Sequence, residues 1–135
     1  MSSKINHIGD TGAGARWKLV NNMMVAIEVA AVAEALVLAG KAGFGIKESA
    51  AIIAASGIAS PVIQQKVARM AEGHFGDTDF ALGLMLKDAD YAIAYARQNG
   101  MSLALLPAAA NLFRLADVKG RGADDVAAVF TAVED

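Results

Sequence analysis

The sequence contains no cysteine, which excludes disulfide bonds, thiolate metal sites and a cysteine nucleophile. Only two histidines are present, His7 and His74, and the sequence places no cluster of metal ligands around either of them. We therefore predict no metal site. The sequence also lacks basic runs and clusters of arginine with aromatic residues, and its formal net charge is −2. Nucleic acid is therefore not a predicted partner.

Long uninterrupted apolar runs are also missing. A membrane-spanning helix needs about 18 or more consecutive apolar residues. The longest uncharged stretches, 49–65 and 98–113, each contain a proline and several polar residues. The N-terminus has no apolar core of the kind that signal peptides carry. We expect no membrane partner and a cytoplasmic location.

Alanine is abundant, and it points to a helical fold. Apolar residues make up 56% of the 135 residues, against about 45–50% in ordinary soluble domains, and much of the excess is alanine. Alanine is the best helix former. Helical periodicity and end signals predict an all-α fold with one long helix at 13–41 and about five shorter helices around it. We place the shorter helices at 47–55, 61–73, 77–98, 107–118 and 124–133.

The long helix predicts self-association. At 1.5 Å per residue it is about 43 Å long, whereas a small domain is about 30 Å across. The helix is also apolar on most of its faces. An exposed apolar surface of that size is typical of an interface, so we expect a homodimer or a larger homo-oligomer.

The segment before the long helix predicts a strand followed by a glycine turn. Residues 4–8 alternate polar and apolar side chains, as a short strand does. The glycines of 9–14 come in the order G-x-x-G-x-G, not the G-x-G-x-x-G of a dinucleotide-binding turn, and no second strand follows. We therefore predict no complete nucleotide site within this chain.

Polar residues lie on two sides of the long helix. On a projection of 100° per residue, one set forms a narrow charged stripe that solvent can cover. This stripe comprises Arg16, Glu34 and Lys41. Lys18, Asn21 and Asn22 lie well away from the stripe in the N-terminal half of the helix. A lysine and two amides among apolar residues suggest a polar pocket with apolar walls.

Lys18 and Asn22 are an i, i+4 pair, so their side chains are neighbours. An ammonium beside an amide can hold a substrate oxygen and pass it a proton. Spacing alone leaves a second interpretation open, and favours it: a surface lysine with two surface asparagines near the start of a helix. Lys87 and Asp88, in a charged part of a later helix, are likewise typical of a solvated face.

Four sequence motifs together resemble the 3-hydroxyisobutyrate dehydrogenase family, whose members are also called β-hydroxyacid dehydrogenases. The first is Gly9-x-x-Gly12-x-Gly14-x-x-x-Lys18-x-x-Asn21-Asn22, and the second is Glu34-Ala-Leu. The third is Phe80-x-Leu-x-Leu-Met-Leu-Lys87-Asp88, and the fourth is Asp125-Val-Ala-Ala128. Together they cover nearly the whole chain in the order found in the family.

The resemblance implies a fold and a set of site residues. The fold is that of the C-terminal domain of 6-phosphogluconate dehydrogenase. Lys18 is implied to be the catalytic general acid/base, and Asn22, with Asn21 beside it, to bind substrate. Lys87 is implied to lie near substrate and the nicotinamide cofactor. Ala15 stands where many family members have glutamine.

The resemblance further implies that 1–8 is the last strand of a missing Rossmann domain and that 9–135 is the helical domain for substrate and oligomerisation. The implied activity is the NAD- or NADP-dependent oxidation of a small 3-hydroxy acid to its semialdehyde, or the reverse. The missing domain would hold most of the cofactor, so we expect the chain alone to be catalytically incompetent. The alternative is a standalone, non-catalytic helical module for dimerisation or scaffolding.

Overall fold

The computed structural model describes residues 12–134. The predicted strand at 4–8 and the first part of the glycine turn lie outside this range. Within it the secondary structure is helical, apart from an isolated antiparallel bridge between Ala81 and Asp125. The helices are α2 (Ala13–Lys41), α3 (Ile46–Ala55), α4 (Pro61–Glu72), α5 (Leu82–Gln98), α6 (Leu105–Ala116), η1 (Asp117–Arg121), η2 (Val126–Val129) and α7 (Phe130–Glu134). The prediction of an all-α fold is confirmed.

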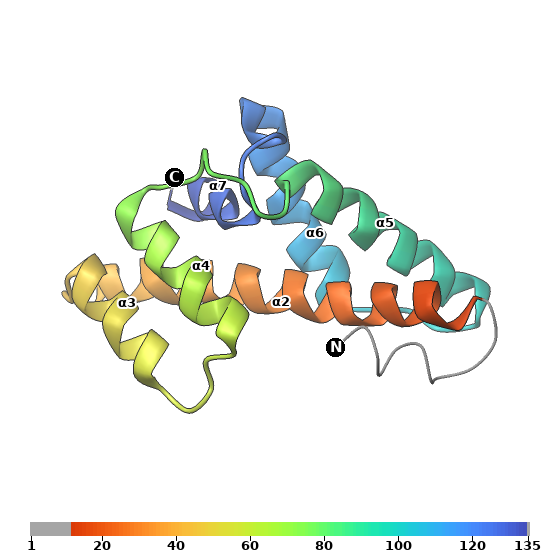
Figure 1. Ribbon diagram of the computed structural model, residues 1–135, viewed down its shortest axis with the longest axis horizontal. Coiled ribbons are helices and arrows are strands. Elements are labelled where there is room, and N and C mark those ends of the chain that lie inside the picture. Colours follow the sequence, from red (N-terminus) through yellow and green to blue (C-terminus); the bar gives the residue numbers. More distant parts are fainter. Residues whose placement is uncertain (1–11, 135) are drawn as a thin grey trace.

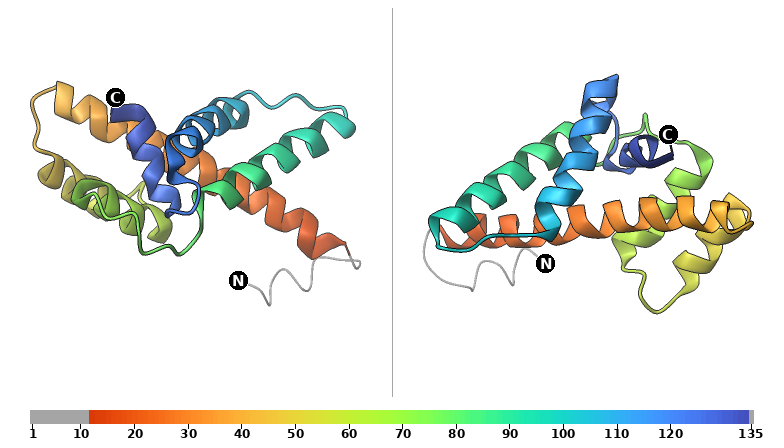
Figure 2. Two further views of the ribbon diagram at one scale, coloured as in Figure 1. Left: turned by 90° about the horizontal axis from the view of Figure 1, so that it is seen from above. Right: turned by 180° about the vertical axis from the view of Figure 1, so that it is seen from behind.

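Helix α2 runs the length of the described molecule, and the other helices pack along it (Figure 1). The pair α3 and α4 lies against its C-terminal half, whereas α5 lies along its N-terminal half (Figure 2). Helices α6 and α7 contact its middle. The N-terminal half of α2, which carries the predicted site residues, therefore lies beside α5 rather than beside α3 or α4.

Small residues on α2 let its neighbours approach closely. Ala26, Ala30 and Ala33 are buried on one face together with Val29 and Leu36, and their spacing of three and four residues is that of a single helical face. They belong to the same buried cluster as large side chains of other helices, which include Leu106 and Phe113 of α6 and Met85 of α5. This interface is the core of the domain.

Helix α2 is long and apolar enough to cross a membrane when only length and composition are considered. The core helix of a soluble domain satisfies the same criterion, and α2 is packed against every other α-helix of the described chain. The absence of a membrane partner therefore stays a prediction.

Four helix starts differ from the sequence prediction. Helix α3 starts one residue earlier, and the predicted helix at 124–133 is divided into the 3₁₀ helix η2 and the short helix α7. The starts of α5 and α6 differ by two residues or more. Helix α5 begins at Leu82 rather than at 77 or 78. The backbone N–H groups of Asp79 and Phe80 donate to the Asp125 side chain, at 3.1 and 3.4 Å, so this segment serves as a partner for a distant residue. Helix α6 begins at Leu105, with Pro107 inside its first turn, where the missing N–H costs no hydrogen bond.

The predicted ends of α4 are confirmed. The Ser60 hydroxyl accepts a hydrogen bond from the Ile63 N–H at 3.2 Å, and Pro61 occupies the first helical position. At the other end Gly73 has a φ of 68°, the left-handed conformation that glycine adopts without strain.

Candidate active site

A hydrogen bond between α2 and α5 marks the candidate site. Asn22 Nδ2 donates to Asp88 Oδ2 at 2.8 Å, and the two residues are 66 positions apart in the sequence. Asn22 is only 9% exposed, and Asp88 is half-buried. The bond fixes the amide of Asn22 against α5. The side chain of Asn22 is therefore not a freely solvated amide.

Lys18 lies one helical turn before Asn22, about 40° around α2. Its side chain is exposed, and it forms no hydrogen bond or ion pair with any residue between 12 and 134. No described segment covers that side of α2, so the predicted pocket around Lys18 stays a prediction. The ammonium is available to a ligand or to another protein surface.

The other two predicted residues lie on neighbouring faces. Asn21 is exposed and projects 100° away from Asn22, so it does not share the contact with α5. Lys87 is exposed, and its Nζ lies 5.9 Å from the centroid of the Tyr91 ring. Both Lys87 and Tyr91 line a hollow of about 340 Å³ on α5. The structure brings Asn22 and Asp88 together and leaves Lys87 on the adjoining face.

Asp88 is the residue to which the sequence motif assigned no role. It stands in register with buried positions of α5, three residues after Met85 and four before Ala92. A carboxylate inside such a buried stripe signals a polar partner on the facing helix, because a buried charge needs compensation. The sequence contained this signal, but it could not identify Asn22 as the partner.

A second polar cluster ties the start of α5 to α4. Asp125 is fully buried, and its Oδ1 lies 3.0 Å from Nζ of Lys66, which is 4% exposed. Asp125 Oδ2 also accepts from the Ala127 N–H at 3.0 Å. Burial raises the pKa of Asp125, but the hydrogen bonds from Ala127, Lys66 and Asp79 outweigh this and hold the pKa below its ordinary value. Every polar partner here is satisfied within the fold, so the cluster anchors α5 structurally.

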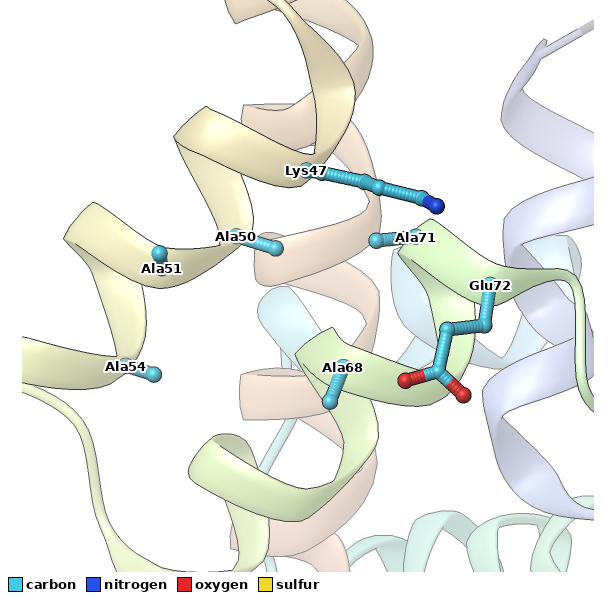
Figure 3. A pocket seen from close by; sticks show the side chains of 7 residues that line it. All are labelled: Lys47, Ala50, Ala51, Ala54, Ala68, Ala71 and Glu72. Carbon is cyan, nitrogen blue, oxygen red and sulfur yellow. The ribbon is translucent and has the colours of Figure 1, made fainter.

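Further hollows in the described chain are lined by residues other than Lys18, Asn22 and Lys87. One of about 400 Å³ lies between α3 and α4, and its floor consists of alanines. Figure 3 shows Lys47 extending over this hollow from α3 toward the end of α4, where Glu72 lies. Another, of about 360 Å³, lies between the start of α2 and the end of α5 and is lined mainly by apolar side chains. No group of three or more acidic or histidine side chains in the described range could hold a metal ion.

The fold and the site define a class: an all-α domain, built on one long helix, that presents an unpaired lysine beside an amide held by a carboxylate. A family model described as the NAD-binding of NADP-dependent 3-hydroxyisobutyrate dehydrogenase matches residues 12–133. The chain therefore belongs to the 3-hydroxyisobutyrate dehydrogenase family, and the resemblance seen in its motifs is confirmed.

Individual relatives show the same likeness. The chain is 33% identical over 131 residues to 2-(hydroxymethyl)glutarate dehydrogenase of Eubacterium barkeri. The matched segment covers 96% of this chain and 43% of that protein. The chain is also 31% identical over 124 residues to the cytokine-like nuclear factor N-PAC of Anopheles gambiae, covering 92% of this chain and 22% of that protein. Its fold is similar to that of the crystal structure of 3-hydroxyisobutyrate dehydrogenase from Salmonella typhimurium, with a TM-score of 0.83 and 25% identity, covering 89% of this chain and 42% of that one. The chain thus spans less than half the length of these relatives.

Proposed function

We propose that this chain supplies the substrate-facing half of an NAD- or NADP-dependent oxidoreductase that interconverts a small 3-hydroxy acid and its semialdehyde. The observation that carries the proposal is the exposed, unpaired Lys18 one turn from the buried Asn22. A lysine needs an open approach to exchange a proton with a bound molecule, and Lys18 has one. Membership of the dehydrogenase family supports the reaction class.

The chemistry assigned to this chain is proton transfer. When the substrate alcohol is oxidised, its O–H proton passes to the neutral amine of Lys18, and in the reverse direction the ammonium returns it to the carbonyl oxygen. A bound nicotinamide cofactor would supply the hydride chemistry at the carbon that bears this oxygen. Lys87 is an exposed cation, as is Lys18 in its ammonium form, and both fit an anionic substrate such as a hydroxy acid.

The described residues fit one edge of a nicotinamide cofactor but not all of it. The hollow on α5 offers an ammonium from Lys87 and the exposed ring of Tyr91, which suit contact with a polar aromatic group. None of the loops that follow α2 in the described range carries a G-x-G-x-x-G motif at the start of a helix. We therefore infer that Lys87 contacts a cofactor that another domain holds in place.

One relative bears the name of a nuclear factor rather than of an enzyme, so activity needs its own test. A suitable protein is a chimera in which this chain replaces the matching region of the Salmonella typhimurium enzyme, assayed with 3-hydroxyisobutyrate. The parent chimera should turn over. Lys18→Met should lower kcat by about 10²–10⁴-fold, which is the usual contribution of a positioned acid or base.

The matched control is Lys41→Met, which removes an exposed lysine at the far end of the same helix. It should leave kcat unchanged, and circular dichroism should show native helix content for both variants. A Lys18→Met chimera within about threefold of the parent would differ by only about 0.7 kcal/mol in barrier, and Lys18 would then not be the acid/base.

A further inference from the structure

The Asn22 amide can face its partner in only one of two orientations. A carboxylate accepts hydrogen bonds and donates none, so the group that meets Asp88 must be the NH₂ and not the carbonyl oxygen. The 2.8 Å distance from Asn22 Nδ2 to Asp88 Oδ2 agrees with this chemistry. Asp88 therefore fixes the orientation of the planar amide, because turning it over would bring two acceptor oxygens together.

The carbonyl oxygen of Asn22 then points elsewhere. No described residue donates a hydrogen bond to it. All buried side-chain nitrogen and oxygen atoms of the described residues have partners, so this oxygen reaches the surface. Side chains on a helix lean toward its N-terminus, over the residues three and four positions earlier. The oxygen of Asn22 is accordingly presented on the turn that carries Lys18.

We propose that Asp88 and Asn22 form a chain of hydrogen bonds that orients Lys18, in which Asp88 is a positioning residue. The proposal rests on the proposed function and deepens it. When substrate binds, one N–H of Lys18 donates to Asn22 Oδ1, and the lone pair of the neutral amine then points at the substrate hydroxyl. A base oriented by a second group, itself held by a third, is a recurrent arrangement in catalysis.

This arrangement gives Asn22 a different role from direct substrate binding. If Asn22 orients Lys18, its loss slows the chemical step and lowers kcat. If Asn22 instead donates an N–H to the substrate carboxylate, its loss weakens binding and raises KM. The two roles also need different groups at position 22. Orienting Lys18 needs a hydrogen-bond acceptor, whereas binding the substrate carboxylate needs a donor.

An exchange of the two side chains separates these roles. In the double variant Asn22→Asp, Asp88→Asn, the new amide at 88 can donate to the new carboxylate at 22, so the link between α2 and α5 is kept. The second oxygen at position 22 still offers Lys18 an acceptor, but position 22 has lost its donor. The pair also keeps the same total charge.

In the chimera, Asp88→Leu should lower kcat about 10- to 100-fold, a part of the ~10²–10⁴-fold that acid–base catalysis contributes, with KM within about threefold. The exchanged double variant should return kcat to within about tenfold of the parent. Glu34→Leu, which removes an exposed carboxylate from the solvent stripe of α2, should change neither constant. A double variant as slow as Asp88→Leu, or an Asp88→Leu variant in which only KM rises, would overturn the proposal.

The isolated chain gives an independent measurement. The hydrogen bond to Asp88 should move the NMR shift of one side-chain N–H proton of Asn22 downfield from that of a freely solvated amide, and in Asp88→Leu this shift should return toward the free value. Unchanged NMR shifts in Asp88→Leu would show that Asp88 does not set the orientation of the Asn22 amide. A parent chimera without turnover would refute the proposed function, whereas the NMR result would still decide the orientation of Asn22.

Discussion

At the residue scale, two aspartates show how burial and partners assign different roles to the same side chain. Asp88 is half-buried and has one side-chain partner, Asn22, whose remaining polar atom faces outward. Asp125 is fully buried and accepts from the Lys66 ammonium and from backbone N–H groups of two different segments. Asp125 has no atom left for a ligand, so it stabilises the fold, whereas Asp88 can act on a neighbouring group.

The role of Asp125 predicts a loss of stability when its charge is removed. Asp125→Asn leaves the buried Lys66 ammonium with only Asp79, at 3.4 Å, as a carboxylate partner. Breaking a buried ion pair by removing one partner costs about 3–5 kcal/mol, and the contact to Asp79 favours the lower end of that range. Urea unfolding at pH 7 and fixed protein concentration measures the difference. Asp77→Asn, at an exposed position, is the control and should change stability by less than about 0.5 kcal/mol.

The same residue predicts how stability depends on pH. Because the pKa of Asp125 is lowered in the folded state, the unfolded chain takes up a proton first as the pH falls. The contribution of Asp125 is therefore complete above its unfolded pKa of about 3.9, and it is lost as the pH drops below that value through the folded pKa. In Asp125→Asn the free energy of unfolding should therefore fall less steeply than in the parent as the pH is lowered from 5. Parallel curves for parent and variant would contradict this account.

The site residues divide into those that local sequence reveals and those that it does not. Lys18 and Asn22 are one turn apart, so helical spacing alone makes them neighbours, and the family motif points to both. The bond from Asn22 to Asp88 joins positions 66 residues apart, which no local pattern can specify. The sequence also does not show that Lys18 would be open to solvent, because that depends on which segments cover α2.

At the scale of elements, helix ends with local signals could be predicted and those set by distant partners could not. The bounds of α2 were predicted as observed, and α4 carries its cap Ser60 and its terminating Gly73 within its own segment. The start of α5 was misplaced because Asp125, more than 40 residues away, holds Asp79 and Phe80 outside the helix. Tertiary contacts override helix propensity at such points.

The same anchor links elements to the site. Asp125 caps η2 by accepting from the Ala127 N–H, and it binds Lys66 of α4 while holding the residues that precede α5. Helix α5 carries both Asp88 and Lys87. The position of the candidate site therefore depends on a polar cluster that lies outside it.

At the scale of the whole molecule, α2 leaves large apolar side chains uncovered along its length. Trp17, Val20 and Met24 are exposed near its start, and Leu38 is 70% exposed near its end. Single exposed apolar residues are ordinary, but several on one helix of a small domain indicate an interface. These residues carry the proposal that the chain self-associates.

Light scattering of the isolated chain at micromolar concentration tests self-association. We expect a mass of at least twice the 13.9 kDa of one chain. Replacing Leu38 and Met24 by glutamine should reduce the association, since both are exposed and neither lies in the core. A single monomeric species in the parent chain would contradict self-association.

The central claim is that Lys18 transfers the proton, and chemical rescue tests it most directly. In the chimera, Lys18→Ala should lose at least about 10²-fold in kcat, and the exposed position should admit small amines from solution. Ethylamine should restore turnover in a saturable manner. Tetramethylammonium carries a positive charge but no transferable proton, and it should not. Equal rescue by both cations, or a Lys18→Ala chimera as fast as the parent, would contradict the claim.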